Sequence, residues 1–248
     1  VIIAQDEEDH IVACLQSAAC AAELVVVDGG STDRTVELAR EMGAVVVERP
    51  FDGFIEQKNA ALDAASFDWV LSLDADERLS PELMASVTAL FQDGAEPPLP
   101  GYYMPRLSFH LGRWIHHGGW YPDRKLRLVD RRRGRWGGRK VHEKIVLDGE
   151  VGLLVGDIQH FPYRDLHHHL TKMDRYTTMA AEILLEEGRS LPLVRLMVQP
   201  PLQFLKSYVL RRGFLDGRAG FLLALLHARY EFLRMRKLVQ LKAKVKQA

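Results

Sequence analysis

Acidic side chains follow three of the apolar runs in the first 80 residues of this 248-residue chain. They are Asp6 and Glu7 after residues 1–4, Asp28 after residues 24–27, and Asp74 and Asp76 after residues 69–73. If the runs are parallel strands, their carboxyl ends meet at one edge of a sheet, where open α/β folds bind ligands. A single Asp at such a position more often caps the following helix, so only the paired carboxylates point strongly to chemistry.

Asp74 and Asp76 are two residues apart, and an extended chain would place both carboxylates on the same side. Because the run before them is wholly apolar, we expect them to emerge together at the sheet edge. Carboxylate oxygens are hard ligands that suit Mg²⁺ or Mn²⁺, which proteins bind with few side chains while substrate phosphates complete the shell. The spacing therefore indicates metal and phosphate chemistry.

The elements that must position these residues form an alternating pattern over residues 1–94. Strands are predicted at 1–4, 24–27, 45–47 and 69–73, and helices from about Ile11, after Ser31-Thr32-Asp33, over 55–65 and from Ser80-Pro81. Apolar strands that alternate with helices predict a parallel sheet covered on both faces.

The remainder of the chain changes character twice. Prolines 97, 98 and 100 mark a break, and residues 101–161 predict irregular strands and loops that complete the same sheet. A helical pattern returns at Asp165, and Gln199-Pro200-Pro201 is predicted to interrupt it. We therefore expect a catalytic domain over 1–164, with halves 1–94 and 101–164, and a helical C-terminal region over 165–248.

Charge is balanced overall but concentrated at the C-terminal end. The chain has 33 Lys and Arg against 33 Asp and Glu, whereas the segment from Lys206 onward has eleven basic and two acidic residues. No apolar run approaches the roughly 20 residues that span a bilayer. A basic amphipathic helix can lie in the interface of an anionic membrane. We favour a membrane over nucleic acid as the partner of this basic segment, and the alternative is that the helix packs on the protein.

The cysteine content and the first residues give two further expectations. Two cysteines do not support a disulfide-stapled secreted fold. The first residues predict a strand, with no signal peptide visible.

Three segments, in this order, resemble family-2 glycosyltransferases of the GT-A fold. They are VVVDGGSTDRT at 25–35, QKN at 57–59 and LDADE at 73–77. GGWYPD at 118–123, KLRL at 125–128, VHE at 141–143 and GFLDG at 213–217 extend the resemblance to bacterial lipopolysaccharide-core β-1,4-glucosyltransferases. The resemblance implies a Rossmann-like, nucleotide-diphospho-sugar transferase fold. This is a mixed α/β sheet with helices on both faces, followed by C-terminal amphipathic helices.

The same resemblance implies roles for matching positions. The uracil and ribose of a UDP-sugar would be held by Gln5, Asp6, Glu7 and Asp28. Lys58 would lie near the donor, and Arg127 would bind its phosphates. Asp76 would be the direct ligand of Mg²⁺ or Mn²⁺, with Asp74 nearer the ribose or a bridging water.

An inverting transferase needs a general base for the acceptor hydroxyl. Glu143 is our candidate and Asp123 the runner-up, while an ion pair with Lys140 or Lys144 is the structural alternative for Glu143. His142 or His160 could be a further metal ligand, although a lone histidine is more often structural.

These inferences predict a metal-dependent inverting transferase that moves a hexose, which we expect to be glucose, from a UDP-sugar to a lipid-linked saccharide such as a lipopolysaccharide-core heptose. The runner-up keeps the fold and uses a polyprenyl phosphate, polysaccharide or protein acceptor. A sugar nucleotidyltransferase and a non-enzymatic basic membrane-binding protein are less favoured. We expect no nucleic-acid partner, and a cytoplasmic location at the inner face of the bacterial inner membrane.

Overall fold

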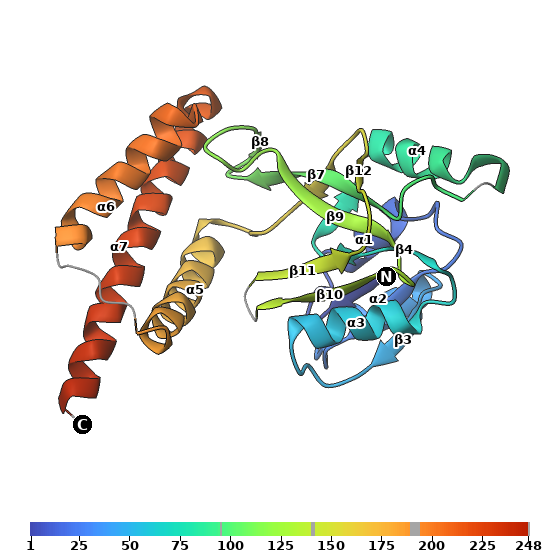
Figure 1. Cartoon of the computed structure of the whole chain (residues 1–248), viewed down its shortest axis with the longest axis horizontal. Coiled ribbons are helices and arrows are strands. Elements are labelled where there is room, and N and C mark those ends of the chain that lie inside the picture. Colours follow the sequence, from blue (N-terminus) through green and yellow to red (C-terminus); the bar gives the residue numbers. More distant parts are fainter. Residues whose placement is uncertain (95, 140–141, 189–193, 248) are drawn as a thin grey trace. The chain divides into compact units, whose positions relative to one another are not determined.

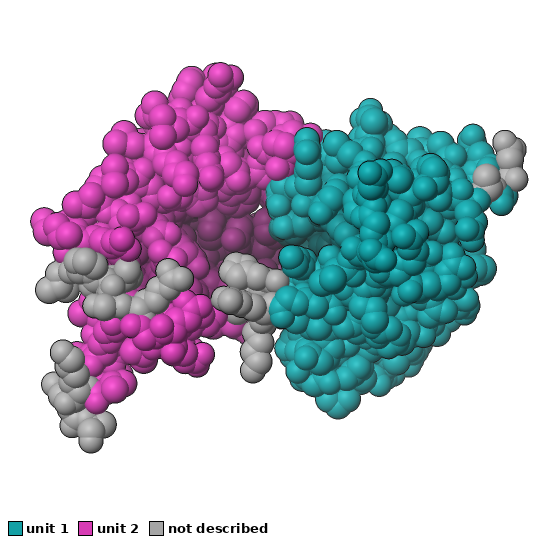
Figure 2. Space-filling model, in the orientation of Figure 1, with its two compact units in different colours: residues 1–107, 123–160 teal, residues 108–122, 161–248 magenta. Residues whose placement is uncertain are grey.

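A computed structural model describes residues 1–94, 96–139, 142–188 and 194–247 (Figure 1). The chain forms two compact units, coloured separately in Figure 2. Unit 1 comprises residues 1–107 and 123–160, and unit 2 comprises residues 108–122 and 161–248.

Unit 1 contains the parallel sheet that the sequence predicts. Its order is β3-β2-β1-β5, and its strands are β1 (Ile2–Ala4), β2 (Val25–Asp28), β3 (Val45–Glu48) and β5 (Leu73–Asp74). All neighbouring strands run parallel. The carboxyl ends of β1, β2 and β5 therefore lie at one edge, as predicted.

The predicted helices of this unit are also present, as α1 (Ile11–Ser17), α2 (Thr35–Glu41), α3 (Phe54–Ala64) and α4 (Pro81–Leu90). Ser80 caps α4, since its Oγ accepts a hydrogen bond from the Leu83 N–H at 3.1 Å. One core cluster contains Leu15 of α1, Ala39 of α2 and Leu83 of α4, whereas Leu62 of α3 belongs to another. The sheet is thus covered on both faces.

The predicted strand 69–73 is divided between two sheets. β4 (Trp69–Leu71) pairs antiparallel with β9 (Asp123–Asp130), while β5 pairs with β1 in the parallel sheet. The break falls at Ser72, whose N–H donates to the Arg127 carbonyl at 2.8 Å. This transfer of the chain places Asp74 beside residues of both sheets.

Most strands of residues 101–160 join β4 and β6 in a second sheet, so the expectation of irregular strands that complete the first sheet was wrong. Its order is β4-β9-β7-β13-β6, and β8 and β12 also pair with β7. Its further strands are β6 (Glu77–Leu79), β7 (Gly101–His110), β8 (Arg113–Ile115), β9 (Asp123–Asp130), β12 (Gly152–Leu153) and β13 (Ile158–His160), and β10 (Gly134–Arg139) and β11 (His142–Leu147) form a separate hairpin. Hydropathy concealed β9 because its charged Arg127 and Asp130 are buried.

Unit 2 consists mainly of α5 (Leu166–Glu186), α6 (Val194–Leu205) and α7 (Gly217–Gln247). Both α5 and α6 pack against α7 (Figure 1). The core contains Ile115, Met173 and Leu223, and the Asp165 carboxylate caps α5 by accepting from the His168 N–H at 2.7 Å. None of the helices in the described part of the chain is long and apolar enough to cross a membrane.

The predicted interruption at Pro200-Pro201 was wrong, because α6 runs through both prolines. Each proline removes one N–H donor, and a helix can accommodate that loss by a local adjustment. A π-helical turn, Lys206–Leu210, follows α6, and Arg211 N–H donates to the carbonyl of Lys206 at 2.9 Å. The helix therefore continues through the prolines, and its hydrogen-bond pattern changes only after them.

Two buried histidines lie in contact inside unit 2. His110 Nε2 is 2.8 Å from His169 Nδ1, and the rings of Tyr163 and His169 stack with centroids 3.9 Å apart. Burial lowers the pKa of each histidine to about 4, and for His169 the neighbouring His110, His227, His168 and Lys172 contribute to the same shift. This pair is neutral at physiological pH.

Candidate active site

The turn that follows β2 is built by Asp28. The Asp28 carboxylate is buried, and its Oδ2 accepts hydrogen bonds from the N–H groups of Gly30 and Ser31, each at 2.9 Å. Gly30 has φ +95°, a conformation that favours glycine. Asp28 thus fixes the backbone at the carboxyl end of β2.

The loop that follows β1 is attached to this turn. The Thr32 N–H donates to Asp6 Oδ1 at 2.7 Å, and the Glu7 N–H donates to Thr35 Oγ1 at 2.8 Å. Gln5 is exposed beside Gly29, where a β-carbon would meet Gln5 Cβ at 3.4 Å. The structure therefore brings together the four residues predicted to hold uracil and ribose.

Asp74, at the end of β5, lies between two cations. Lys58 Nζ from α3 is 2.9 Å from Asp74 Oδ1, and Arg127 Nη2 from β9 is 2.6 Å from Asp74 Oδ2. Burial alone would raise the pKa of Asp74, but the charges of Arg127 and Lys58 outweigh it and hold that pKa well below its usual range. Asp74 is therefore ionised.

Glu77 is a site residue to which the sequence analysis gave no role. It is fully buried, and its Oε1 accepts from Arg127 Nη2 at 2.9 Å and from Arg106 Nη1 at 3.0 Å. Its Oε2 accepts from the Asp74 N–H at 3.0 Å. The place of Glu77 directly after the paired aspartates could have indicated it, whereas Arg106, in the middle of β7, carried no such signal.

Arg106 connects this cluster to Asp123, the predicted runner-up base. Arg106 Nη2 is 2.6 Å from Asp123 Oδ2, and Lys125 Nζ is 3.0 Å from Asp123 Oδ1. Burial would raise the pKa of Asp123, but Arg106 and Lys125 lower it overall. Both carboxylate oxygens of Asp123 are thus held by cations.

Glu143, the first candidate base, lies at the other end of the cluster. Glu143 Oε1 is 3.8 Å from Lys58 Nζ, and its side chain is 23% exposed. Lys58 also lies over the Trp136 ring, 4.4 Å from the centroid. Asn59 fixes the β10-β11 hairpin, which carries Trp136 and Glu143, because its side chain exchanges hydrogen bonds with the Trp136 backbone at 2.9 and 3.0 Å. Lys140, one alternative partner of Glu143, lies outside the described residues.

Carboxylates and cationic side chains consequently alternate across the site. Successive partners in the chain of ion pairs are Asp123, Arg106, Glu77, Arg127, Asp74, Lys58 and Glu143. The two candidate bases lie toward opposite ends of this chain of ion pairs, and Asp123 is also paired with Lys125. Among the described residues, the cation paired with Glu143 is Lys58, at 3.8 Å.

The chain is not extended between Asp74 and Asp76, contrary to the premise from which both carboxylates were expected on one side. A turn at Ala75-Asp76 separates β5 from β6. The turn redirects the second carboxylate, and Asp76 Oδ2 lies 3.5 Å from His160 Nε2 of β13. Both side chains are partly exposed, at 20% and 14%.

Among the described residues, no three His, Cys, Asp or Glu side chains are grouped to hold a metal ion. Asp76 and His160 nevertheless offer convergent oxygen and nitrogen donors, which fits Mn²⁺ or Mg²⁺ if substrate phosphates supply further ligands. Asp74 is committed to Lys58 and Arg127. The side chain of His142, the other histidine considered, lies outside the described residues.

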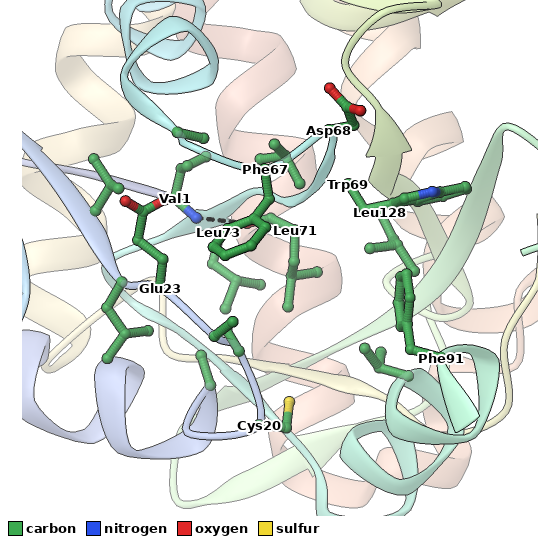
Figure 3. A pocket seen from close by; sticks show the side chains of 18 of the residues that line it. Val1, Cys20, Glu23, Phe67, Asp68, Trp69, Leu71, Leu73, Phe91 and Leu128 are labelled. Atoms are coloured by element: carbon green, nitrogen blue, oxygen red, sulfur yellow. Dashed lines mark hydrogen bonds between the residues drawn. The ribbon is translucent and has the colours of Figure 1, made fainter. Parts of the chain in front are cut away.

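Two other features lie apart from this cluster. Arg132 pairs with Asp68 and Asp130, and Arg135 pairs with Asp63, so these basic residues serve local ion pairs. A cavity of about 530 Å³ is lined by residues including Val1, Glu23, Phe67, Trp69 and Phe91 (Figure 3). It lies toward the amino ends of the strands, and none of the predicted site residues lines it.

Comparison with known proteins agrees with the sequence motifs. A family model described as glycosyl transferase family 2 matches residues 1–145. The lipopolysaccharide core biosynthesis glycosyltransferase LpsC of Rhizobium meliloti (strain 1021) is 32% identical over 96% of this chain and 90% of its own length. An uncharacterized glycosyltransferase of Rickettsia typhi is 29% identical over 98% of this chain and 87% of its own length.

A solved structure of glucosyl-3-phosphoglycerate synthase from Mycobacterium tuberculosis, in complex with Mn²⁺, uridine diphosphate and glucosyl-3-phosphoglycerate, also matches. It is 28% identical and covers 45% of this chain and 43% of its own, with a TM-score of 0.34. The extent of the family match and the identity to LpsC identify this protein as a glycosyltransferase that belongs to family 2.

Proposed function

We propose that this chain is a metal-dependent inverting glycosyltransferase that transfers glucose from a UDP-sugar to a lipid-linked saccharide, such as a heptose of the lipopolysaccharide core. The similarity to a lipopolysaccharide core biosynthesis glycosyltransferase supports this acceptor class. The observation that carries the proposal is the cluster of Lys58, Asp74, Arg127 and Glu143 at the carboxyl edge of β5.

The donor binds across the loops that follow β1 and β2. Gln5, Asp6, Glu7 and Asp28 surround its uridine, for which the hydrogen-bonded pair of loops supplies a preformed frame. Lys58 and Arg127 then face the diphosphate. Because carboxylates already hold both cations in position, little side-chain entropy is lost when the phosphates bind.

Asp76 and His160 would hold the divalent cation, and Asp74 positions the side chains of Lys58 and Arg127. When bound, Mg²⁺ or Mn²⁺ neutralises the negative charge that develops on the leaving diphosphate. The protein contributes the metal-ligand atoms of Asp76 and His160 and the turn between β5 and β6 that positions Asp76.

Glu143 accepts the proton of the acceptor hydroxyl while that oxygen attacks the anomeric carbon and the bond to the diphosphate breaks. Asp123 is less suited to this role, because Arg106 and Lys125 lower its pKa and occupy both of its oxygens. Glu143 Oε1 lies 3.8 Å from Lys58 Nζ, which is longer than the contacts of 2.6 and 3.0 Å that Asp123 has with Arg106 and Lys125.

A polyprenyl phosphate is the second candidate acceptor. A dolichyl-phosphate hexose transferase of Haloferax volcanii is 40% identical over 29% of this chain and 32% of its own length. A phosphate oxygen is already ionised and needs no general base, so transfer that is unaffected by Glu143→Gln would favour this acceptor.

Calorimetric titration with UDP and UDP-glucose, in Mn²⁺ and in EDTA, tests the proposal. We expect metal-dependent binding in the wild type and its loss in Asp76→Asn. Asp52→Asn, which removes an acidic group paired with Arg49, is the matched control and should bind as wild type. If neither UDP nor UDP-glucose binds in Mn²⁺ or in EDTA, that result would contradict the transferase site as proposed.

We also propose a peripheral location at the cytoplasmic face of the inner membrane, where a lipid-linked acceptor would be available. The excess of basic residues after Lys206 supports attraction to an anionic surface.

A further inference from the structure

The outward side of α6 is apolar, which is unusual for a helix at a protein surface. Its exposed apolar residues are Val194 (63%), Met197 (79%), Val198 (47%), Leu202 (52%) and Leu205 (50%). Their spacing of three and four residues places them on one stripe of the helix. No residue of α6 is buried, although the helix packs against α7 (Figure 1).

The stripe continues into the connection between α6 and α7. Val209 is 50% exposed and Leu210 is 77% exposed, and both belong to the π-helical turn. Phe214 and Leu215 follow in the next turn, at 47% and 52%. We call the combined surface, residues 194–215 with these nine exposed apolar side chains, the α6 face.

The exposed charged side chains within residues 194–218, which contain the α6 face, are all basic. Residues 194–218 contain five basic side chains, all exposed: Arg195, Lys206, Arg211, Arg212 and Arg218. The single acidic residue in this range, Asp216, is 1% exposed and accepts from the His117 N–H at 2.8 Å. The face therefore combines apolar area with positive charge that no carboxylate of the segment neutralises at the surface.

The basic α7 helix is organised differently. Its side chains Leu223, Leu226 and Leu238 are buried at 2%, 5% and 1%. Lys237 pairs with Asp174, and Arg234 pairs with Glu231. One side of α7 is thus committed to the interior of unit 2, although Phe221, Leu225, Phe232, Val239 and Val245 of this helix are exposed. The exposed apolar side chains are more closely spaced on α6 and its connection, and α6 has no buried residue.

We propose that the α6 face inserts into the interface of an anionic lipid bilayer, with the five cations at the level of the headgroups. This inference deepens the proposed function, since it rests on a lipid-linked acceptor. Apolar side chains gain by leaving water for the acyl boundary, and Lys and Arg gain by approaching anionic headgroups. A symmetric contact with a second copy fits the face poorly, because it would bring two sets of cations together.

Vesicle co-sedimentation of the full chain tests this assignment. The probes are phosphatidylcholine vesicles with and without phosphatidylglycerol, and the variants are Met197→Glu and Leu210→Glu. We expect binding only to the anionic vesicles, and a loss of at least tenfold in the partition coefficient for each variant. Met197→Leu, which preserves apolar area, should bind as wild type.

Val155→Glu is the matched control, since Val155 is an exposed apolar residue of unit 1 at 65%. It makes the same change of charge and should retain binding. Both glutamate substitutions in the α6 face are at exposed positions, and circular dichroism checks that their helices persist. UDP binding, measured on the same samples, should be unchanged in every variant and separates failure of this inference from failure of the transferase site.

Three results would overturn the assignment. They are wild-type protein that does not bind anionic vesicles, equal loss of binding in Val155→Glu and Met197→Glu, and self-association that disappears in Met197→Glu while vesicle binding is absent.

Discussion

Lys58 Nζ lies 2.9 Å from Asp74 Oδ1, while Arg127 holds the other oxygen of the same carboxylate. The first aspartate of the Asp74-Ala75-Asp76 motif is therefore engaged with protein cations, and the second is turned toward His160. The two carboxylates have different surroundings, and this difference supports separate roles for them.

Replacing Lys58 with Met should weaken UDP binding by about tenfold or more, because a charge-assisted contact contributes roughly 1.5–3 kcal/mol. The change should also raise the pKa of Asp74, since one of the two cations that lower it is lost. Calorimetric titration with UDP measures the first effect. Lys144→Met removes an exposed lysine from the nearby β11 strand and should leave the affinity intact. Equal losses in both variants would indicate a general effect of net charge.

Glu143→Gln should lower turnover by about 10²–10⁴-fold, the range of a general base, while donor affinity changes little. Asp123→Asn should reduce turnover less, because Arg106 and Lys125 already hold that carboxylate. Steady-state kinetics with varied donor separates kcat from KM. A larger fall in kcat for Asp123→Asn than for Glu143→Gln would exchange the two assignments.

Glu77→Gln should destabilise unit 1 by about 3–5 kcal/mol, since it leaves the buried guanidinium group of Arg127 and the partly buried one of Arg106 with incomplete compensation. Urea unfolding gives the change in free energy. Glu82→Gln, at an exposed position in the first turn of α4, is the control and should change stability by less than about 1 kcal/mol. A similarly small effect in Glu77→Gln would show that the ion pairs contribute little net stability.

Acidification should destabilise unit 2 through His110 and His169. Their folded-state pKa of about 4 lies below the ordinary value of about 6.5, so the unfolded chain binds more protons between these limits. Their contribution is fully present above about pH 6.5 and is lost as the pH falls toward 4. The urea midpoint should therefore drop between about pH 7 and pH 5.

His169→Gln should make that drop smaller, because one of the titrating groups is removed. His167→Gln, an exposed position on the same helix, is the control and should retain the wild-type pH dependence. If the drop is the same in both variants, other groups dominate the acid response.

The sequence by itself determined the parallel sheet and the edge at which the site lies. Apolar strands with helices between them can bury both faces of a sheet in few ways, and the acidic residues at their ends follow from chain order. The spacing of the acidic residues pointed to Asp74, and the resemblance to family-2 glycosyltransferases pointed to Lys58 and Arg127. These residues come from β5, α3 and β9, and the fold brings them within hydrogen-bond distance.

Only the tertiary structure decided how these charges are paired. Hydropathy describes β9 as polar, yet Arg127 is buried because Asp74 and Glu77 neutralise it. Likewise, a turn at Ala75-Asp76 replaces the extended chain that local spacing suggested, and Asp74 and Asp76 contact different residues. The apolar side of α6 is exposed although its periodicity suits a core. Periodicity reports which residues share a face, whereas what that face meets depends on contacts between segments that are distant in the chain.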